Sequence, residues 1–318
     1  MMQVITAALK TWWQRASDGW NQFWFCPVQP HSLAIIRVGC GLMLAYMHLI
    51  WLLRQADFLG PNAWIDRSTS KMLHENDWAW SWLWYTDNPW LTGLHELLAL
   101  VAALMMAAGL FTRVVVPVVW IFTLMTCHRL TFALFGLDQI AMMLAMYLMI
   151  ADSGAVWSVD SRLHRGESSG KWWQPVFELS TRNNVATRLI QVHLCVIYLF
   201  GGLGKMRGEM WYEGSALWFT LVNYEYQSMD LTWLGKSPLL IAMLSAGTIF
   251  WETFYCALVW PKLTRPFALG MAFFVHAGIA LGLGMITFGL IMILANFAFI
   301  DPSFVQRVVT RRNPADLH

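Results

Sequence analysis

Long apolar stretches separated by short polar segments dominate the pattern of this chain. They cover residues 32–53, 91–111, 114–130, 135–151, 186–204, 238–260, 266–283 and 284–300. A helix needs about 20 apolar residues to cross a bilayer, and shorter helices are accepted inside a bundle. The pattern predicts an all-α integral membrane protein, a polytopic helical bundle of about eight transmembrane helices, give or take one. The third and fourth stretches, and likewise the last two, could each form one long broken helix.

The amino-terminal residues have a different pattern. Apolar residues follow one helical face and polar residues lie on the others: Ile5, Leu9, Trp12, Ala16 and Trp20 against Lys10, Gln14 and Asp18. Such an amphipathic helix lies in the membrane interface rather than crossing the bilayer. Its polar residues interrupt any apolar core, so we expect no cleavable signal peptide. We divide the chain into an interfacial segment (1–30), a transmembrane domain (31–303) and a basic cytoplasmic tail (304–318).

The composition supports a membrane protein. Hydrophobic residues make up 58% and charged residues 13% of the chain, whereas soluble domains contain about 25% charged residues. The 20 tryptophans fit this class, since indoles gather at membrane interfaces. The net charge of +2 comes without a basic run, so we expect the lipid bilayer and no nucleic acid as a partner. The sequence does not predict an oligomeric state.

The basic residues predict an orientation. With the amino terminus inside, the inner segments hold about twice as many Lys and Arg residues as the outer ones. This bias favours an even number of spans, both termini in the cytoplasm and a multi-pass protein of the cell membrane. Lys205 then lies at the outer face. Two outer segments, 54–90 and 205–237, are long and aromatic, and the inner loop 152–185 contains a flexible turn at Ser168-Ser169-Gly170.

Ionisable residues inside the apolar stretches are costly and usually face the bundle interior. Those of this chain are Arg37, His48, His95, Glu96, His128, Asp138, His193, Glu252 and His276. Arg37 is too deep to reach the interface freely, so we expect a structural ion pair with Glu252 or Asp138. A lone helix histidine such as His276 is usually a packing residue, and a catalytic or ligand role is the alternative.

Lys205 follows Gly201, Gly202 and Gly204 at the end of the fifth stretch. Glycines let a neighbouring helix approach closely or let the backbone bend. The lysine is then either an interfacial anchor or an amine in a partly dry pocket. A dry pocket favours the neutral amine, which is a base.

A polar face leads up to this lysine. Gln191, Tyr198 and Lys205 recur every seven residues and share one helical face, while His193 lies on another. By depth alone, His276 and Lys205 could border one outer cavity.

Other site chemistry has little support in the sequence. The five cysteines form no CxxC pair and suggest packing rather than a metal site or disulfides. The ionisable residues show no metal-ligand spacing on one helical face, so we expect no metal. Serine-nucleophile elbows, phosphate-binding loops and dinucleotide fingerprints are absent.

Several motifs resemble a known family. They are Gly109-Leu110-Phe111-Thr112-Arg113, Trp157-Ser158-Val159-Asp160, and Tyr198-Leu199-Phe200-Gly201-Gly202-Leu203-Gly204-Lys205 followed by Trp211 and Glu213-Gly214. Together they resemble the HTTM (horizontally transferred transmembrane) family, bacterial membrane proteins related to vitamin K-dependent gamma-carboxylase. The similarity runs from about residue 30 to 303 and includes a stretch from Thr264-Arg265-Pro266 through His276 to Asp301-Pro302.

The resemblance implies a chemistry for Lys205. In the carboxylase, the lysine of the matching motif deprotonates reduced vitamin K, and the oxygenated product removes a proton from a glutamate before carbon dioxide adds. This implies Lys205 as general base and His276 as a second catalytic residue. Tyr198, Trp211 and Asp138 would bind the substrate, and the protein would use a reduced, vitamin K-like quinone as cofactor. Glu252 would be a structural charge that pairs with a basic residue.

The sequence also departs from the carboxylase pattern. Where the carboxylase has an asparagine–histidine pair, this chain has Phe135, Gly136, Leu137, Asp138 and Gln139. The chain ends at His318, so we expect no large extracytoplasmic domain to hold a peptide substrate. The quinone half of the reaction is therefore expected, and carboxylation of protein glutamates is not.

Two alternatives remain open. The chain could be a non-catalytic scaffold or accessory protein that helps a secreted peptide mature, with Lys205 as an interfacial anchor. A transporter would also use buried charges, although the stretches show no paired halves with matching broken helices.

Overall fold

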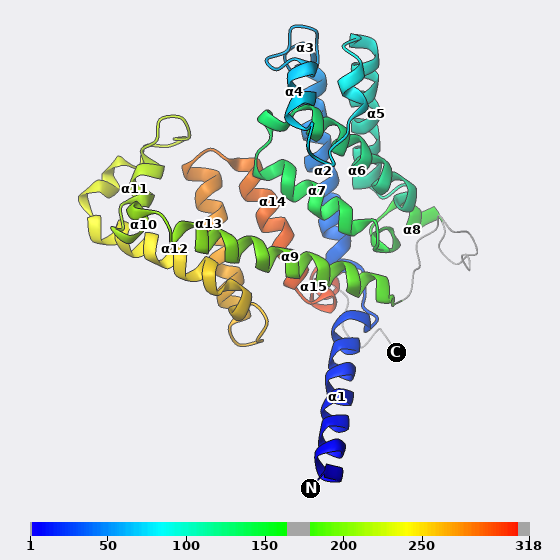
Figure 1. Cartoon of the computed structure of the whole chain (residues 1–318), viewed down its shortest axis with the longest axis vertical. Helices are drawn as coiled ribbons and strands as arrows, with labels where there is room; N and C mark the ends of the chain where they lie inside the picture. The colour runs from blue at the N-terminus through cyan, green and yellow to red at the C-terminus, as the bar shows by residue number, and fades with distance from the viewer. Residues whose placement is uncertain (1, 164–178, 311–318) are drawn as a thin grey trace.

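The computed structural model describes residues 2–163 and 179–310. In these ranges every regular element is a helix (Figure 1). The elements are α1 Met2–Phe25, α2 His31–Leu53, α3 Gln55–Phe58, α4 Arg67–Leu73, η1 Trp82–Tyr85, α5 Pro89–Ala108, α6 Thr112–Arg129, η2 Thr131–Ala133, α7 Gly136–Leu148, η3 Ser153–Ala155, α8 Val159–Leu163, α9 Thr181–Lys205, α10 Glu209–Tyr212, α11 Ala216–Leu221, η4 Thr232–Lys236, α12 Pro238–Leu258, α13 Arg265–Gly282, α14 Ile286–Asn296, η5 Phe297–Phe299 and α15 Pro302–Thr310. The predicted turn at Ser168-Ser169-Gly170 and residues 311–318 of the predicted tail lie outside the described residues.

The described helices confirm an all-α protein with membrane-spanning segments. Five of them are long and apolar enough to cross a membrane: α2, α5, α9, α12 and α13. The remaining predicted stretches are helices too, namely α6, α7 and α14. The predicted count of about eight spans is not confirmed, because α7 has only 13 residues. A helix of that length rises about 20 Å, short of the roughly 30 Å hydrocarbon core.

Two predicted breaks are real helix boundaries. The short helix η2 separates α6 from α7, and Gly284, with φ at 69°, lies between α13 and α14. This left-handed conformation suits glycine. A further bend follows the last apolar stretch. Ile286–Phe299 and Pro302–Val309 meet at 111° and form a broken span or a re-entrant loop.

The helices pack in two groups. In one, α2 lies against α5 and α7, and α6 packs on α5; in the other, α9 lies along α12 and α13 pairs with α14. Figure 1 shows the first group in blue to green and α12 to α14 in yellow to red on the opposite side. Helix α14 contacts both α2 and α7 and joins the groups.

Glycine allows the closest helix contact beside the candidate site. A Cβ added at Gly202 would lie 2.4 Å from Thr253 Oγ1 and 2.7 Å from the Thr253 backbone nitrogen. The expectation that the glycine run lets a neighbouring helix approach is therefore confirmed at Gly202, where α9 meets α12. Gly204 has no atom within 4 Å of such a Cβ, so that position faces open space.

Helix α1 extends away from the rest of the protein (Figure 1). Its end is held by Phe23, whose carbonyl accepts a hydrogen bond of 2.8 Å from Asn184 Nδ2 and whose ring lies 4.4 Å from the guanidinium of Arg188. Trp12 and Trp20 are 64% and 62% exposed. An exposed apolar face suits a helix in the interface, and this placement stays a prediction.

Arg37 does not form the predicted ion pair with Glu252 or Asp138; that prediction is wrong. The guanidinium is fully buried and donates to four backbone carbonyls, those of Met106, Ala107, Ser153 and Trp157. These carbonyls lie at the end of α5 and around η3, where the chain leaves its helices with unpaired acceptors. A residue in the second turn of α2 therefore connects three chain segments.

Two of the family-like motifs pack in the same region as Arg37. Asp160 accepts hydrogen bonds from the backbone nitrogens of Phe111 (2.8 Å) and Thr112 (2.9 Å), at the start of α6. Gly109 has φ at 74°, and a Cβ there would lie 2.4 Å from Arg37 Nη1. These contacts position the end of α5 and the start of α6.

Candidate functional site

Lys205 forms an ion pair at the end of α9. Its Nζ lies 2.6 Å from Glu252 Oε2 on α12, with 29% of the lysine side chain and 11% of the glutamate side chain exposed. The ammonium group also lies 5.5 Å from the centre of the Trp211 ring. The lysine is therefore held beside a carboxylate and an aromatic ring, in a site that is partly open, instead of extending freely to the interface.

A buried chain of hydrogen bonds includes Tyr198, which lies two turns before Lys205 on the same face of α9. Tyr255 donates to Asn296 Oδ1 (2.5 Å), and Asn296 Nδ2 donates to the Tyr198 hydroxyl (2.9 Å). That hydroxyl lies 2.8 Å from His276 Nε2 on α13. Because the Tyr198 oxygen already accepts from Asn296, its proton is free to point at His276. The chain is thus directed toward the histidine.

His276 has one nitrogen left over. With Nε2 accepting from Tyr198, the neutral ring carries its proton on Nδ1, which is buried and has no hydrogen-bond partner among the described residues. Buried polar groups are nearly always paired, and the exceptions call for an explanation. An acceptor atom on a bound ligand would complete this histidine.

The predicted polar face of α9 is confirmed. Gln191, Tyr198 and Lys205 each reach another part of the bundle, with Gln191 Nε2 donating to the carbonyl of Ala298. His193 lies elsewhere and meets the hydroxyl of Tyr147 at 2.9 Å. Tyr198 and Lys205 are separated by about 10 Å along the helix axis. A cavity that joins Lys205 to His276 stays a prediction.

Asp138 lies at the start of α7 and caps that helix. Its Oδ2 accepts from the backbone nitrogen of Phe135 at 2.8 Å, and the side chain is 3% exposed. The Phe288 ring packs against Gly136, two residues before Asp138. The centre of the same ring lies 5.9 Å from the centre of the His276 ring. The structure gives Asp138 a capping role, and its predicted contact with substrate stays a prediction.

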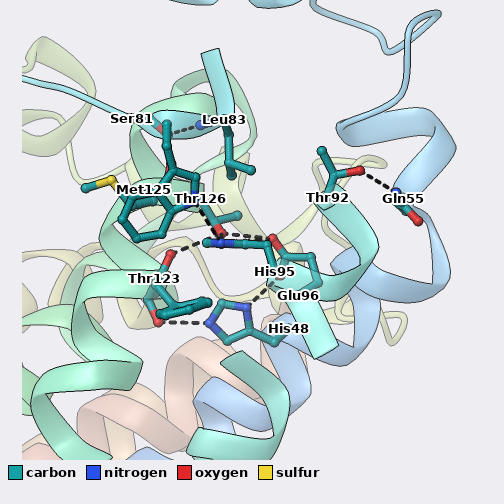
Figure 2. Close-up of polar contacts among 12 residues, drawn as sticks. His48, Gln55, Ser81, Leu83, Thr92, His95, Glu96, Thr123, Met125 and Thr126 are labelled. Carbon is teal, nitrogen blue, oxygen red and sulfur yellow. Dashed lines mark hydrogen bonds and ion pairs between the residues drawn. The ribbon is translucent and has the colours of Figure 1, made fainter. Parts of the chain in front are cut away.

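A second polar cluster lies wholly inside the other helix group. His48 Nδ1 is 2.7 Å from Glu96 Oε2, and its Nε2 is 2.9 Å from Thr123 Oγ1. Figure 2 shows His48 from α2 and His95 from α5 both close to Glu96. Both side chains of the His48–Glu96 pair are fully buried. We call this the His48–Glu96 pair and the first site the Lys205–Glu252 pair.

On the His95 side of the His48–Glu96 pair, the donor and acceptor of each hydrogen bond can be assigned in order from Trp82 to Glu96. The indole of Trp82 only donates, so His95 Nδ1 accepts its proton at 3.0 Å. His95 Nε2 then donates to Thr126 at 2.9 Å, and Thr126 donates to Glu96 Oε1 at 2.9 Å. His95 is therefore neutral, and Oε1 of Glu96 is an acceptor.

The other side of the pair fixes His48. The Thr123 hydroxyl donates to the carbonyl of Val119 at 2.7 Å, so it accepts from His48 Nε2. One further proton must then lie in the 2.7 Å contact between His48 Nδ1 and Glu96 Oε2. The pair holds a single shared proton and no net charge in either arrangement. Because every end of the cluster is satisfied, it has no free group to offer a ligand.

Comparison with protein families decides the identity of the chain. A family model described as HTTM domain matches residues 25–304. The chain belongs to the HTTM family. No curated protein and no solved structure matches the chain significantly. The Lys205–Glu252 pair and the His48–Glu96 pair lie within the HTTM domain, whose matched region begins at the end of α1.

Sequence reasoning missed part of the first site of this HTTM domain. Asn296 and Tyr255 link the hydrogen-bond chain to His276, but neither is ionisable at neutral pH and neither belongs to a motif. A search for any polar side chain within the apolar stretches would have found Asn296. In the described ranges, no group of three or more His, Cys, Asp and Glu residues is suited to a metal ion.

Proposed function

We propose that this HTTM-family protein acts on a lipid-soluble, quinone-like substrate, with Lys205 as general base. The observations that carry the proposal are the partly open Lys205–Glu252 pair and the free nitrogen of the buried His276, which contacts Tyr198 two turns earlier on the same face of α9. The Lys205–Glu252 pair can exchange a proton, whereas the His48–Glu96 pair is closed. The family resemblance assigns the same lysine to proton removal from a hydroquinone.

The pair supplies a route for the proton. When the proton shared by the two groups rests on Glu252, Lys205 Nζ has a free lone pair. The amine can then take the proton of a substrate hydroxyl, breaking the O–H bond and forming an N–H bond. The resulting ammonium group stabilises the substrate anion electrostatically, and low dielectric strengthens that attraction. Oxidation of the anion requires dioxygen as the co-reactant.

The neighbouring side chains suit the remainder of such a substrate. Trp211 offers an aromatic face beside the amine. His276 Nδ1 can donate to a second oxygen of the substrate, and Tyr198 holds the ring in that tautomer. We propose Trp211 and Tyr198 as binding and positioning residues, and His276 as the second catalytic residue.

Oxygen uptake by purified protein in lipid nanodiscs tests the proposal, with a reduced naphthoquinone as substrate. We expect Lys205→Ala to lower quinol consumption by about 10²–10⁴-fold, the usual contribution of a general base. Lys205→Arg keeps a cation beside Glu252 but supplies no neutral amine, so it should be equally inactive. Lys236→Ala, at the exposed end of η4, is the matched control and should retain activity.

An unchanged rate in Lys205→Ala would overturn the catalytic proposal. So would wild-type protein that consumes no more quinol than empty nanodiscs. In that case the scaffold role is favoured, because the Lys205–Glu252 pair also joins α9 to α12. The aromatic residues Trp64 (73% exposed) and Tyr224 (94% exposed) would then each be available to contact a protein or peptide.

We further propose that both termini lie in the cytoplasm and that the protein is in the bacterial inner membrane. The exposed lysines 236 and 262 flank α12 and test this orientation. In a Cys26→Ser background, a membrane-impermeant maleimide should label Lys236→Cys in spheroplasts and Lys262→Cys only after permeabilisation. The reverse labelling pattern would invert the proposed orientation.

A further inference from the structure

A small aromatic cavity is lined by residues of neither the Lys205–Glu252 pair nor the His48–Glu96 pair. It has a volume of about 190 Å³ and is lined in part by Phe58, Trp64 and Phe132. Phe58 belongs to α3, while Phe132 belongs to η2 just beyond α6. The cavity therefore lies between two connecting segments of the first helix group. Its walls are suited to one flat apolar group.

Arg129 also lines this cavity and is only 2% exposed. Its Nη2 donates to the carbonyl of Ile65 at 3.0 Å, while the buried Nη1 has no hydrogen-bond partner among the described residues. A buried guanidinium group is costly unless it is paired with an acceptor or a carboxylate. Here the charge is buried and one nitrogen is unused.

The carboxylates near Arg129 are committed to other groups. Asp57, which itself lines the cavity, pairs with Arg54 at 2.6 Å, and Asp87 pairs with Arg67 at 2.9 Å. Asp66 caps α4 by accepting from the Thr69 backbone nitrogen at 2.9 Å. Asp87 and Asp66 act on Arg129 only at longer range. None of the three satisfies Nη1, which suits an anion brought by a ligand.

We propose that this cavity binds a small aromatic carboxylate. Its ring would lie among Phe58, Trp64 and Phe132, and its carboxylate would accept a charge-assisted hydrogen bond from Arg129 Nη1. The size is sufficient, because an apolar cavity of about 150 Å³ already binds benzene. The exposed Arg54 and Arg67 nearby place the opening in a polar layer, so the ligand enters from water. The proposal does not depend on the chemistry of Lys205.

Ligand-observed NMR with the full chain in nanodiscs tests this site, using benzoate and its neutral analogue benzamide as probes. We expect benzoate to bind at least about tenfold more tightly, because its negative charge adds ionic attraction to a hydrogen bond that the benzamide carbonyl can also accept. Arg129→Gln should remove the preference. Ala133→Trp, which fills the cavity from η2 without replacing the guanidinium, should abolish binding of both probes.

Lys71→Gln is the matched control. It removes one positive charge from an exposed residue of α4 and should leave benzoate binding unchanged. If Arg129→Gln fails to fold, Ala133→Trp and the benzamide comparison still decide the question. Equal binding of benzoate and benzamide to the wild-type protein would overturn the proposal, and so would benzoate binding that survives Ala133→Trp.

Discussion

The Lys205–Glu252 pair and the His48–Glu96 pair have similar chemistry and opposite surroundings. The Lys205–Glu252 pair joins α9 to α12 and is partly exposed, with a histidine nitrogen left free nearby. The His48–Glu96 pair joins α2 to α5, is fully buried, and lies in a cluster whose donors and acceptors are all matched. We propose that the two pairs differ in reactivity because unsatisfied groups remain near one of them and not around the other.

The same substitution at both glutamates gives the largest expected contrast. Glu252→Gln should lower quinol consumption by about 100-fold, because an amide cannot hold the shared proton. Glu96→Gln should leave that rate unchanged, because it lies in the closed cluster. Both rates are measured with purified protein in nanodiscs. Equal losses in the two variants would remove the distinction between the pairs.

Removing the Glu96 side chain should reveal its structural role. Glu96→Ala leaves His48 and Thr126 without their partner, and breaking a buried pair typically costs about 3–5 kcal/mol. Glu96→Gln should cost less than about 1 kcal/mol, because its amide donates to His48 Nδ1 and its oxygen accepts from Thr126. Unfolding free energies in mild detergent measure both changes. A Gln variant as unstable as the Ala variant would contradict the proton assignment.

The glycines before Lys205 test whether the open pair depends on close helix contact. Gly202→Ala places a Cβ against the Thr253 backbone and should destabilise the protein by about 1–3 kcal/mol, as overpacking does. Gly204→Ala is the matched control, because it faces open space and improves helix propensity. Thermal unfolding of the two variants measures the difference, and similar melting temperatures would contradict the packing argument.

Asp66, outside the membrane helices, extends the comparison to a solvent-exposed carboxylate. Hydrogen bonds from Ser68 and from the backbone and hydroxyl of Thr69 lower the pKa of Asp66 below its ordinary value. A lowered pKa stabilises the fold above the unfolded value of about 4, and that stability is lost as the pH falls through the folded value. The difference in melting temperature between wild type and Asp66→Asn should therefore persist from pH 7 to about pH 4 and shrink below it. A constant difference would contradict this account.

The sequence was informative where one helix carries the signal. The eight apolar stretches coincide with helices, and spacing alone grouped Gln191, Tyr198 and Lys205 on one face of α9. It failed where the partner comes from another segment. Arg37 was expected to pair with a carboxylate, yet it donates to carbonyls freed by the end of α5. Helix ends offer acceptors to any donor that the fold brings near, and composition does not record which donor that is.

The sequence alone determined that this is a helical membrane protein, because hydrophobicity and helical periodicity are local properties of the chain, and its motifs carried the resemblance to the HTTM family. Only the tertiary structure decided that Lys205 meets Glu252, that His276 keeps a free nitrogen, and that His48 and Glu96 form a closed pair. Those outcomes depend on how the helices pack. Packing sets which distant side chains share a proton and which buried groups are left without a partner.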